Sequence, residues 1–213
     1  MEAKSFMKVE KLAINIIIRK LTPSLAEDYV TFFDTTPHNE KYRIKCYCVY
    51  WCSEESESKN FSSKKARRDY AFQCVEENII QGYLAYCDDK VVGWCNVNTK
   101  SDCLKCKGWR GMNGPRKGFL PTEETTPEIK VKSVFCFAVA PKMRRRGIAS
   151  QLLEQICQDA AEDGFDFVEA YPDKEVTAKS EDFVGYTEMY EKQGFTVCHE
   201  TSKKMVMRKS LRQ

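Results

Sequence analysis

The sequence predicts a single α/β domain, built on a mixed β-sheet that helices flank. Apolar runs of strand length alternate with amphipathic runs of helix length, and one central strand leads through a helix into another strand. Such a strand–helix–strand unit makes its two strands parallel, whereas short turns elsewhere join antiparallel neighbours. The sheet is therefore expected to contain both strand directions, in one domain over residues 1–213.

Composition and charge narrow the class of protein. Of the 213 residues, 42% are hydrophobic and 12% are aromatic, which is typical of a folded globular chain. No apolar run reaches the length of a membrane span, and the N-terminus lacks the apolar core of a secretory signal. The net charge of +3 is too small to indicate nucleic-acid binding. We expect a cytoplasmic protein whose partners are neither membranes nor nucleic acids.

The 11 cysteines, in a chain without a visible signal peptide, favour reduced thiols over a disulfide framework. A zinc site is the alternative, with Cys103 and Cys106 as one half and Cys46, Cys48 and Cys52 as the other. Neither histidine of the chain lies in these clusters, and the second cluster is interleaved with large apolar residues. We therefore expect buried or loop cysteines and no bound metal.

The first part of the chain is expected to hold two strands and two helices. Ser24, followed three residues later by Glu27, fits the N-cap of the first helix. A polar loop at 53–63 precedes the second helix. In chain order, the expected elements are a strand at 13–21, a helix at 24–34, a strand at 44–52 and a helix at 63–81.

The second of these helices is expected to begin with positively charged residues. Lys64, Lys65, Arg67 and Arg68 occupy its first turn, where they oppose the helix dipole. This misfit hints at a nearby anionic partner. A solvated basic face, accompanied by acidic residues of the same helix, is the simpler interpretation.

The second part of the chain begins with a hairpin that turns at Asp88-Asp89. Residues 99–126 are rich in glycine and show no periodicity, so they are expected to form a long loop. Gly164 and Gly194 are expected to end helices. The expected elements are strands at 82–87, 90–98, 134–139, 165–172, 195–200 and 204–209, and helices from 147 to 163 and at 187–193.

The strand at 134–139 should be central in the sheet. Strict alternation would place Val134, Cys136 and Ala138 on one face and Phe135, Phe137 and Val139 on the other. Both sets are apolar, so both faces of this strand should be covered.

The turn after this strand has the features of an anion site. A helix N-terminus offers unpaired N–H groups and a positive dipole end, and Gly147 lets a ligand approach the backbone closely. Arg144, Arg145 and Arg146 beside the turn strengthen the case for phosphate. A nucleic-acid patch would explain the arginines but not the glycine that follows them.

This stretch resembles the pyrophosphate loop of the GNAT superfamily, the Gcn5-related N-acetyltransferases. The family pattern Arg/Gln-x-x-Gly-x-Gly/Ala is matched from Arg144 to Ala149, between an apolar strand and an amphipathic helix. The resemblance implies the GNAT fold and acetyl-CoA as the acyl donor. The residues that it assigns to cofactor binding are Phe137, Ala138, Val139, Arg144, Arg145, Arg146, Gly147, Ile148, Ala149 and Ser150.

The segment from Met189 to Phe195 resembles a second GNAT signature, Leu-Tyr-Glu-Lys-x-Gly-Phe. The resemblance makes Tyr190 the general acid that protonates the departing thiolate, with packing at the sheet end as the simpler alternative. Phe183 stands where the family often has an asparagine that contacts the cofactor. Glu169, in the polar slot of the neighbouring strand, is the remaining candidate for a general base; loss of the amine proton to water is the alternative.

These expectations describe an N-acetyltransferase that passes the acetyl group of acetyl-CoA to a primary amine by direct attack in a ternary complex. The acceptor would be a small molecule or a peptide, and a homodimer is compatible with the sequence. The missing asparagine leaves open an acyl-CoA-binding or regulatory domain of the same fold that does not turn over. A zinc-binding interaction protein is the third hypothesis.

Overall fold

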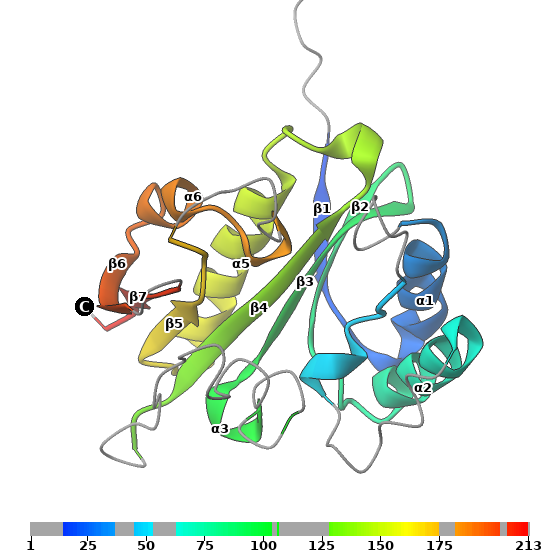
Figure 1. Ribbon diagram of the computed structural model, residues 1–213, viewed down its shortest axis with the longest axis horizontal. Coiled ribbons are helices and arrows are strands. Elements are labelled where there is room, and N and C mark those ends of the chain that lie inside the picture. The colour runs from blue at the N-terminus through cyan, green and yellow to red at the C-terminus, as the bar shows by residue number, and fades with distance from the viewer. Residues whose placement is uncertain are drawn as a thin grey trace, which may run out of the picture.

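The computed structural model describes residues 15–36, 45–52, 63–103, 106, 128–174, 182–200 and 204–212. A seven-stranded sheet with the order β1-β2-β3-β4-β5-β7-β6 organises these residues (Figure 1). Only β4 and β5 run parallel, so the predicted α/β class with a mixed sheet is confirmed. The strands are β1 (Ile17–Lys20), β2 (Gly82–Cys87), β3 (Lys90–Thr99), β4 (Val131–Val139), β5 (Phe167–Ala170), β6 (Thr196–Glu200) and β7 (Met205–Ser210).

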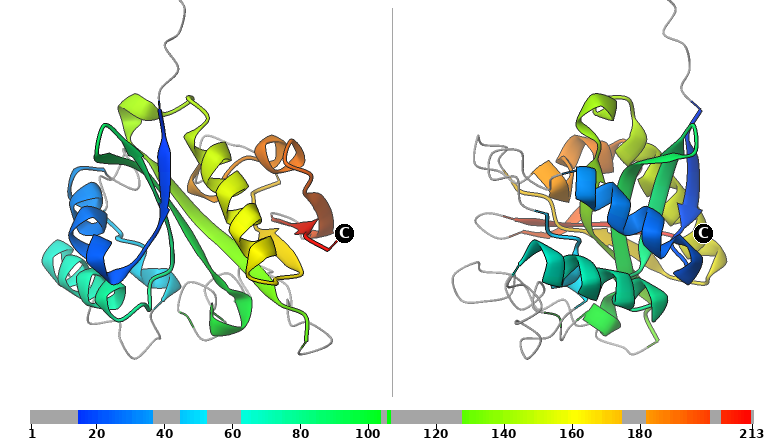
Figure 2. Two further views of the ribbon diagram at one scale, coloured as in Figure 1. Left: turned by 180° about the vertical axis from the view of Figure 1, so that it is seen from behind. Right: turned by 90° about the vertical axis from the view of Figure 1, so that its right-hand side faces the viewer.

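Helices cover both faces of the sheet, as the central strand requires (Figures 1 and 2). One face carries α1 (Ala26–Thr35) and α2 (Lys64–Glu76), and the other carries α5 (Ile148–Glu162) and α6 (Thr187–Glu191). The apolar residues of α5 that face the sheet are all buried: Ile148, Leu152, Ile156, Cys157 and Ala160. The remaining helical turns are α3 (Lys100–Cys103), η1 (Pro23–Leu25), η2 (Val49–Trp51), η4 (Pro141–Met143) and η5 (Asp182–Val184).

The predicted hairpin between β2 and β3 is confirmed. Asp88 and Asp89 both have positive φ, 48° and 60°. A two-residue turn of this kind matches the right-handed twist of the strands that it joins, and aspartate tolerates positive φ better than most residues.

Helix α2 ends earlier than the expected residue 81. Asn78 adopts φ 57°, and the N–H groups of Asn78 and Ile79 donate to the carbonyls of Val75 and Cys74 at 3.0 and 2.7 Å. This is the paired hydrogen-bond pattern by which a left-handed residue closes a helix. The asparagine, followed by an isoleucine, is the sequence signal that marks this end.

The expected N-cap at Ser24 is wrong. Ser24 lies inside the 3-10 turn η1, and α1 begins after Leu25 without any side-chain cap. Pro23, at the start of η1, has no N–H to be capped and fixes its own φ, so the tighter turn forms before the α-helix.

The basic first turn of α2 finds its counter-charges inside the protein. Lys64 and Arg68 contact Asp34 of α1 at 3.2 and 2.8 Å, and Arg68 also contacts Glu27 at 2.8 Å. Lys65 pairs with Asp69 of its own helix. The anionic partner that the charge misfit suggested is therefore the neighbouring helix α1.

The strand expected at 44–52 is wrong for its described residues, 45–52. Tyr47 and Cys48 have φ values of 50° and 51°, and the 3-10 turn η2 follows. Two successive left-handed residues cannot continue an extended strand. The Tyr29 hydroxyl donates to the Tyr47 carbonyl at 2.7 Å, a tertiary contact that stabilises this bend.

Strict alternation along β4 is also wrong. The register passes from Asn96↔Cys136 to Val97↔Val134, so Phe135 is an extra residue on β4, a β-bulge. Phe135, Cys136 and Ala138 consequently pack toward α1 and α2, whereas Val134 and Phe137 pack toward α5. Both faces are still buried, as predicted.

The parallel strands β4 and β5 separate beyond the bulge. Their register covers Val131 to Val134 of β4 and ends at Ala170 of β5, whereas β3 follows β4 as far as Val139 (Figure 1). The last part of β4 therefore has no strand partner on its β5 side within the described chain. This opening positions the candidate site.

Three expectations extend beyond the described residues. Most of the 53–63 loop and of the 99–126 loop lies outside them, and so does the start of the strand expected at 13–21. Among the helices that the structure describes, none combines the length and the apolar character needed to cross a bilayer.

Candidate active site

A cavity of about 350 Å³ lies where β4 separates from β5. Three segments line it: the end of β4, the connection into α5 with the first turn of that helix, and the approach to α6. The lining residues are Phe137, Ala138, Val139, Met143, Arg144, Arg145, Gly147, Ile148, Ala149, Ser150, Phe183, Gly185, Tyr186 and Met189.

The connection from β4 to α5 is a compact turn that exposes the helix N-terminus. Arg145 and Gly147 are left-handed, with φ values of 59° and 80°, and Gly147 is the N-cap of α5. Gly147 has no side chain to cap the helix, and the first turn carries no acidic residue. The N–H groups of this turn are thus oriented for an anionic ligand rather than for an internal carboxylate.

Backbone donors of β4 face the opening. The Ala140 N–H donates to Val92 on β3 at 2.9 Å. Because alternate residues of a strand direct their N–H groups to opposite edges, those of Phe137 and Val139 point toward the β5 side. This is the edge at which β5 has already diverged, so these groups can meet a ligand.

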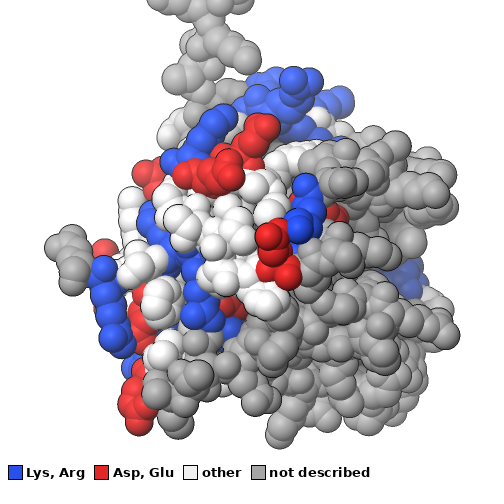
Figure 3. Space-filling model, turned by 60° about the vertical axis from the view of Figure 1, so that its left-hand side comes forward, with Lys and Arg blue, Asp and Glu red and all other residues white. Residues whose placement is uncertain are grey.

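Positive charge surrounds the turn. Lys142, Arg145 and Arg146 are exposed, and within the described part of the chain Arg145 and Arg146 make no ion pair. Arg144 is folded back, and its Nε donates to the Val139 carbonyl at 3.2 Å. Figure 3 shows Lys and Arg side chains gathered at the end of the molecule where the β4–α5 connection lies, with acidic side chains directly below them and a mostly white, uncharged area further down.

The predicted cofactor residues and the cavity agree except at one position. Arg146 does not contribute to the lining, and the other nine predicted residues do. Sequence reasoning did not assign Met143, Gly185, Tyr186 and Met189 to the site. The i, i+3 spacing of Tyr186 and Met189 at the start of α6 was the available signal, since it places both on one helix face.

Tyr190 lies behind the wall of the cavity. Its ring is fully buried, and its hydroxyl donates to the Val184 carbonyl at 2.7 Å. Burial raises the pKa of Tyr190 well above its ordinary value. A Cβ atom on Gly185, which lines the cavity, would lie 2.9 Å from the hydroxyl, so one glycine separates this oxygen from the cavity. Tyr186, in contrast, is exposed and lines the cavity directly.

Glu169 lies on β5 in a buried polar network. Its carboxylate contacts Lys100 at 3.1 Å, accepts from the Tyr171 hydroxyl at 2.6 Å and pairs with Arg208. The Tyr171 oxygen also lies 2.8 Å from Ser133 Oγ. Both carboxylate oxygens are therefore engaged, and Glu169 does not line the described cavity. Its role as a base stays a prediction.

Replacement of Glu169 by glutamine is expected to destabilise the fold by about 3–5 kcal/mol, because the buried Lys100 would lose its ion pair with Glu169. Urea unfolding at neutral pH measures this change. Asp163→Asn is the matched control, since its ion pair with Lys20 is exposed and is expected to contribute less than about 1 kcal/mol. A loss below about 1 kcal/mol in Glu169→Gln would contradict the structural importance of this network.

The cysteines assigned to the alternative zinc site come from two segments that pack into the same hydrophobic core. Cys103 and Cys106 lie beside β3, and Cys46, Cys48 and Cys52 lie in the segment before α2. Among the described residues, no group of three or more His, Cys, Asp and Glu side chains is placed to hold a metal ion.

We expect elemental analysis of protein purified without chelator to return no zinc. One zinc per chain, lost in a Cys103→Ser/Cys106→Ser protein, would overturn this prediction.

In this site, β4 separates from its parallel neighbour β5 and leads into a helix N-terminus that contains a glycine. Residues 45–195 match the family model described as Acetyltransferase (GNAT) family. The match covers more than half of the chain. The chain belongs to the GNAT family.

Solved structures show that this GNAT chain has the fold of its family. An acetyltransferase structure has a TM-score of 0.58 at 14% identity, over 92% of this chain and 100% of that chain. The structure of the NatC complex bound to Gag peptide and CoA has a TM-score of 0.54 at 13% identity, over 93% of this chain and 100% of that chain. A GNAT acetyltransferase structure from Streptococcus pneumoniae has a TM-score of 0.52 at 12% identity, over 92% of this chain and 99% of that chain. A comparison with curated proteins finds no match.

Family membership confirms the predicted recognition and fold. The family match spans residues 45–195, and the extent of the GNAT domain predicted over residues 1–213 stays a prediction. The roles of the individual site residues also stay predictions, because neither the family match nor the solved structures assign them.

Proposed function

We propose that the protein transfers the acetyl group of acetyl-CoA to a primary amine by direct attack in a ternary complex. The observation that carries this proposal is the cavity between the end of β4 and the N-terminus of α5. It combines helix N–H groups and arginines for a pyrophosphate with strand N–H groups for an extended arm. Charge-assisted hydrogen bonds of this kind contribute roughly 1.5–3 kcal/mol each, so a few of them can anchor a coenzyme.

The β4 backbone would position the thioester. In the proposed complex, the N–H groups of Phe137 and Val139 bind the pantetheine arm, and a free strand N–H polarises the thioester carbonyl. Donors fixed in the sheet need no reorganisation as charge develops on the oxygen. Phe183, where the family often has asparagine, lines the cavity with an apolar ring, so this chain would bind the arm with one polar contact fewer.

Tyr190 is the proposed acid for the departing thiolate. The phenol is protonated at neutral pH, which an acid requires. To act as the acid, the Tyr190 hydroxyl would exchange its hydrogen bond to the Val184 carbonyl for one to the thiolate sulfur of CoA, reached past Gly185.

Glu169 is the proposed base. It would accept the amine proton through Tyr171, whose hydroxyl already donates a hydrogen bond to it. Direct loss of that proton to water is the alternative.

A second candidate function is acyl-CoA binding without turnover. The engaged state of both proposed catalytic groups favours it: the Tyr190 hydroxyl is bonded to Val184, and Glu169 is held by two cations. This candidate keeps the cavity and its ligand but needs no acid or base.

A screen of amines separates the two candidates. The purified protein is mixed with acetyl-CoA and, in separate reactions, polyamines, aminoglycosides, amino acids and peptides with free N-termini, and released thiol is followed. Transferase activity predicts steady, amine-dependent release of CoA with at least one class. CoA binding by calorimetry, combined with no amine-dependent release in any class, would instead support the binding function.

A further inference from the structure

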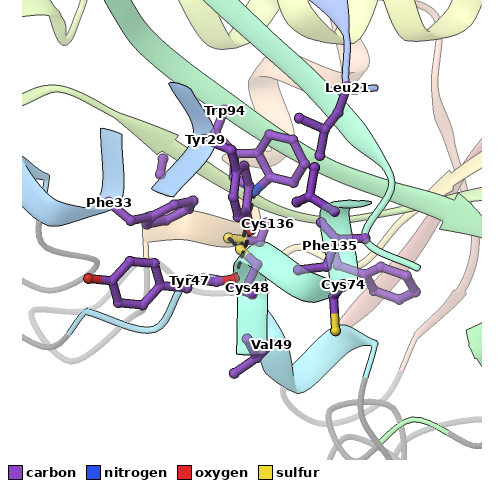
Figure 4. Packing of buried hydrophobic residues seen from close by; sticks show 14 of the residues in the cluster. Leu21, Tyr29, Phe33, Tyr47, Cys48, Val49, Cys74, Trp94, Phe135 and Cys136 are labelled. Atoms are coloured by element: carbon purple, nitrogen blue, oxygen red, sulfur yellow. Dashed lines mark hydrogen bonds between the residues drawn. The ribbon is translucent and has the colours of Figure 1, made fainter. Parts of the chain in front are cut away.

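Two thiols from distant parts of the chain meet on the side of β4 that faces α1 and α2. Cys48, ahead of η2, and Cys136, on β4, lie 88 positions apart, and their Sγ atoms are 3.5 Å apart. Both side chains are buried. Figure 4 shows the two sulfur atoms facing each other among the aromatic rings of Tyr29, Phe33 and Trp94.

The surroundings of Cys48 differ from those of an ordinary core cysteine. Its Sγ accepts a hydrogen bond from the Trp94 indole N–H at 3.2 Å, and its own backbone N–H donates to Cys46 Sγ at 3.5 Å. Cys48 and the preceding Tyr47 both have positive φ. Backbone in this region is uncommon for non-glycine residues and is concentrated at functional positions.

The pair adjoins the part of β4 that shapes the cavity. Cys136 follows the bulge residue Phe135 and precedes Phe137, which lines the cavity. Trp51, in the turn that Cys48 opens, stacks on Phe135 with centroids 4.5 Å apart and planes at 13°. A covalent link between the two thiols would therefore shift the bulge at Phe135 of β4.

We propose that Cys48 and Cys136 are an oxidative modification site that closes into a reversible disulfide. With a low-molecular-weight disulfide as the oxidant, its S–S bond breaks and one S–S bond forms between the two cysteines. The two protein thiols lose two electrons and two protons, and two molecules of the small thiol are produced. The sulfur atoms approach from 3.5 Å to the bonded distance of about 2.0 Å.

The site is expected to react slowly. Burial, followed by the contact with Cys136, raises the pKa of the Cys48 thiol, whereas the contacts with Cys46 and Trp94 lower it. The net shift is upward, so little thiolate is present at neutral pH, and the reaction rate should rise with pH. Because both thiols are buried, the oxidant reaches them only when the 45–52 segment opens locally.

The test uses the full chain, purified reduced and incubated with oxidised glutathione at pH 8.5. After alkylation of the remaining thiols and proteolysis, mass spectrometry identifies cross-linked peptides. We expect one peptide pair that joins Cys48 to Cys136, absent from both Cys48→Ala and Cys136→Ala and reversed by dithiothreitol. The exposed Cys198 reports that the oxidant is active, because it should be glutathionylated first.

A second close pair serves as the matched control. Cys103 and Cys106 also contact each other, three positions apart in sequence. The Cys103→Ser/Cys106→Ser protein removes this competitor and should give the same Cys48–Cys136 peptide. Glutathionylated Cys198 without any Cys48–Cys136 link in this folded protein would overturn the proposal.

The consequence for activity rests on the proposed transferase function. The link would shift the bulge beside Phe137, and displacements of about 1 Å at a reacting centre can lower rates by roughly a hundredfold. We expect oxidation to lower the turnover of the wild-type protein ten- to hundredfold and dithiothreitol to restore it. The same oxidation should not lower the turnover of Cys136→Ala. Cross-linking with unchanged turnover would overturn this consequence. Inactivity of the reduced protein would overturn the proposed function and leave the mass-spectrometric result unaffected.

Discussion

Replacement of Gly147 by glutamate is expected to lower the affinity for CoA by at least about a hundredfold, which corresponds to roughly 2.7 kcal/mol. Gly147 is the N-cap of α5 and lines the cavity, and a Cβ there meets only Gln151 Nε2, at 4.0 Å. The new side chain would therefore fit without unfolding the protein. It would bring a negative charge and added bulk to the place where we expect the pyrophosphate.

A matched control exists at the other end of the same helix. Gly164 is also exposed and left-handed, with φ 73° against 80° for Gly147, and no atom lies within 4 Å of its added Cβ. Gly164→Glu therefore imposes the same backbone strain and the same charge far from the cavity. Isothermal titration of CoA should show near-normal affinity for Gly164→Glu and loss of binding for Gly147→Glu. Equal affinities in the two folded variants would rule out the assignment of this loop.

Tyr190→Phe is expected to reduce turnover by roughly 10²–10⁴ if Tyr190 protonates the departing thiolate. The proton is needed only as the C–S bond breaks, so the affinity for acetyl-CoA should change little and the loss should appear in kcat. Steady-state kinetics with chemistry shown to be rate-limiting provides the measurement.

The structure offers a competing role for this hydroxyl. It donates to the buried Val184 carbonyl, and its removal would leave that oxygen without this donor, at a cost of about 1–3 kcal/mol in stability. A Tyr190→Phe protein that keeps more than about half of its turnover but unfolds more easily has lost only this structural bond. Tyr186→Phe is the parallel variant, because Tyr186 lines the cavity; a selective loss there would transfer the acid role to Tyr186.

Local sequence patterns were sufficient for most of the fold. The apolar face of α5, its end at Gly164 and the Asp88-Asp89 turn each follow from periodicity or turn chemistry, and the structure confirms them. The loop residues from Arg144 to Ser150 could be proposed for the site for a similar reason, and all of them except Arg146 line the cavity. A helix N-terminus after a strand is a local arrangement, and its glycine and arginines are adjacent in sequence.

Two of the predictions that failed depend on contacts between distant residues. The bulge at Phe135 is defined by the register with β3, and apolar residues on both sides of β4 concealed the change of face. The bend at Tyr47 and Cys48 depends on Tyr29 and Trp94, which lie on other elements. The ion pairs of Glu169 with Lys100 and Arg208 join three separate segments, so no local pattern could show them, and the role of Glu169 as a base stays a prediction.

The most direct test of the account is a product measurement on matched proteins. Wild type, Gly164→Glu and Gly147→Glu are incubated with acetyl-CoA and the best amine of the panel, and mass spectrometry quantifies the acetylated amine against released CoA. We predict that wild type and Gly164→Glu each form acetylated amine and free CoA in equal amounts. Gly147→Glu should form neither product. Tight CoA binding by wild type with no acetylated amine from any class of acceptor would contradict the proposed transfer.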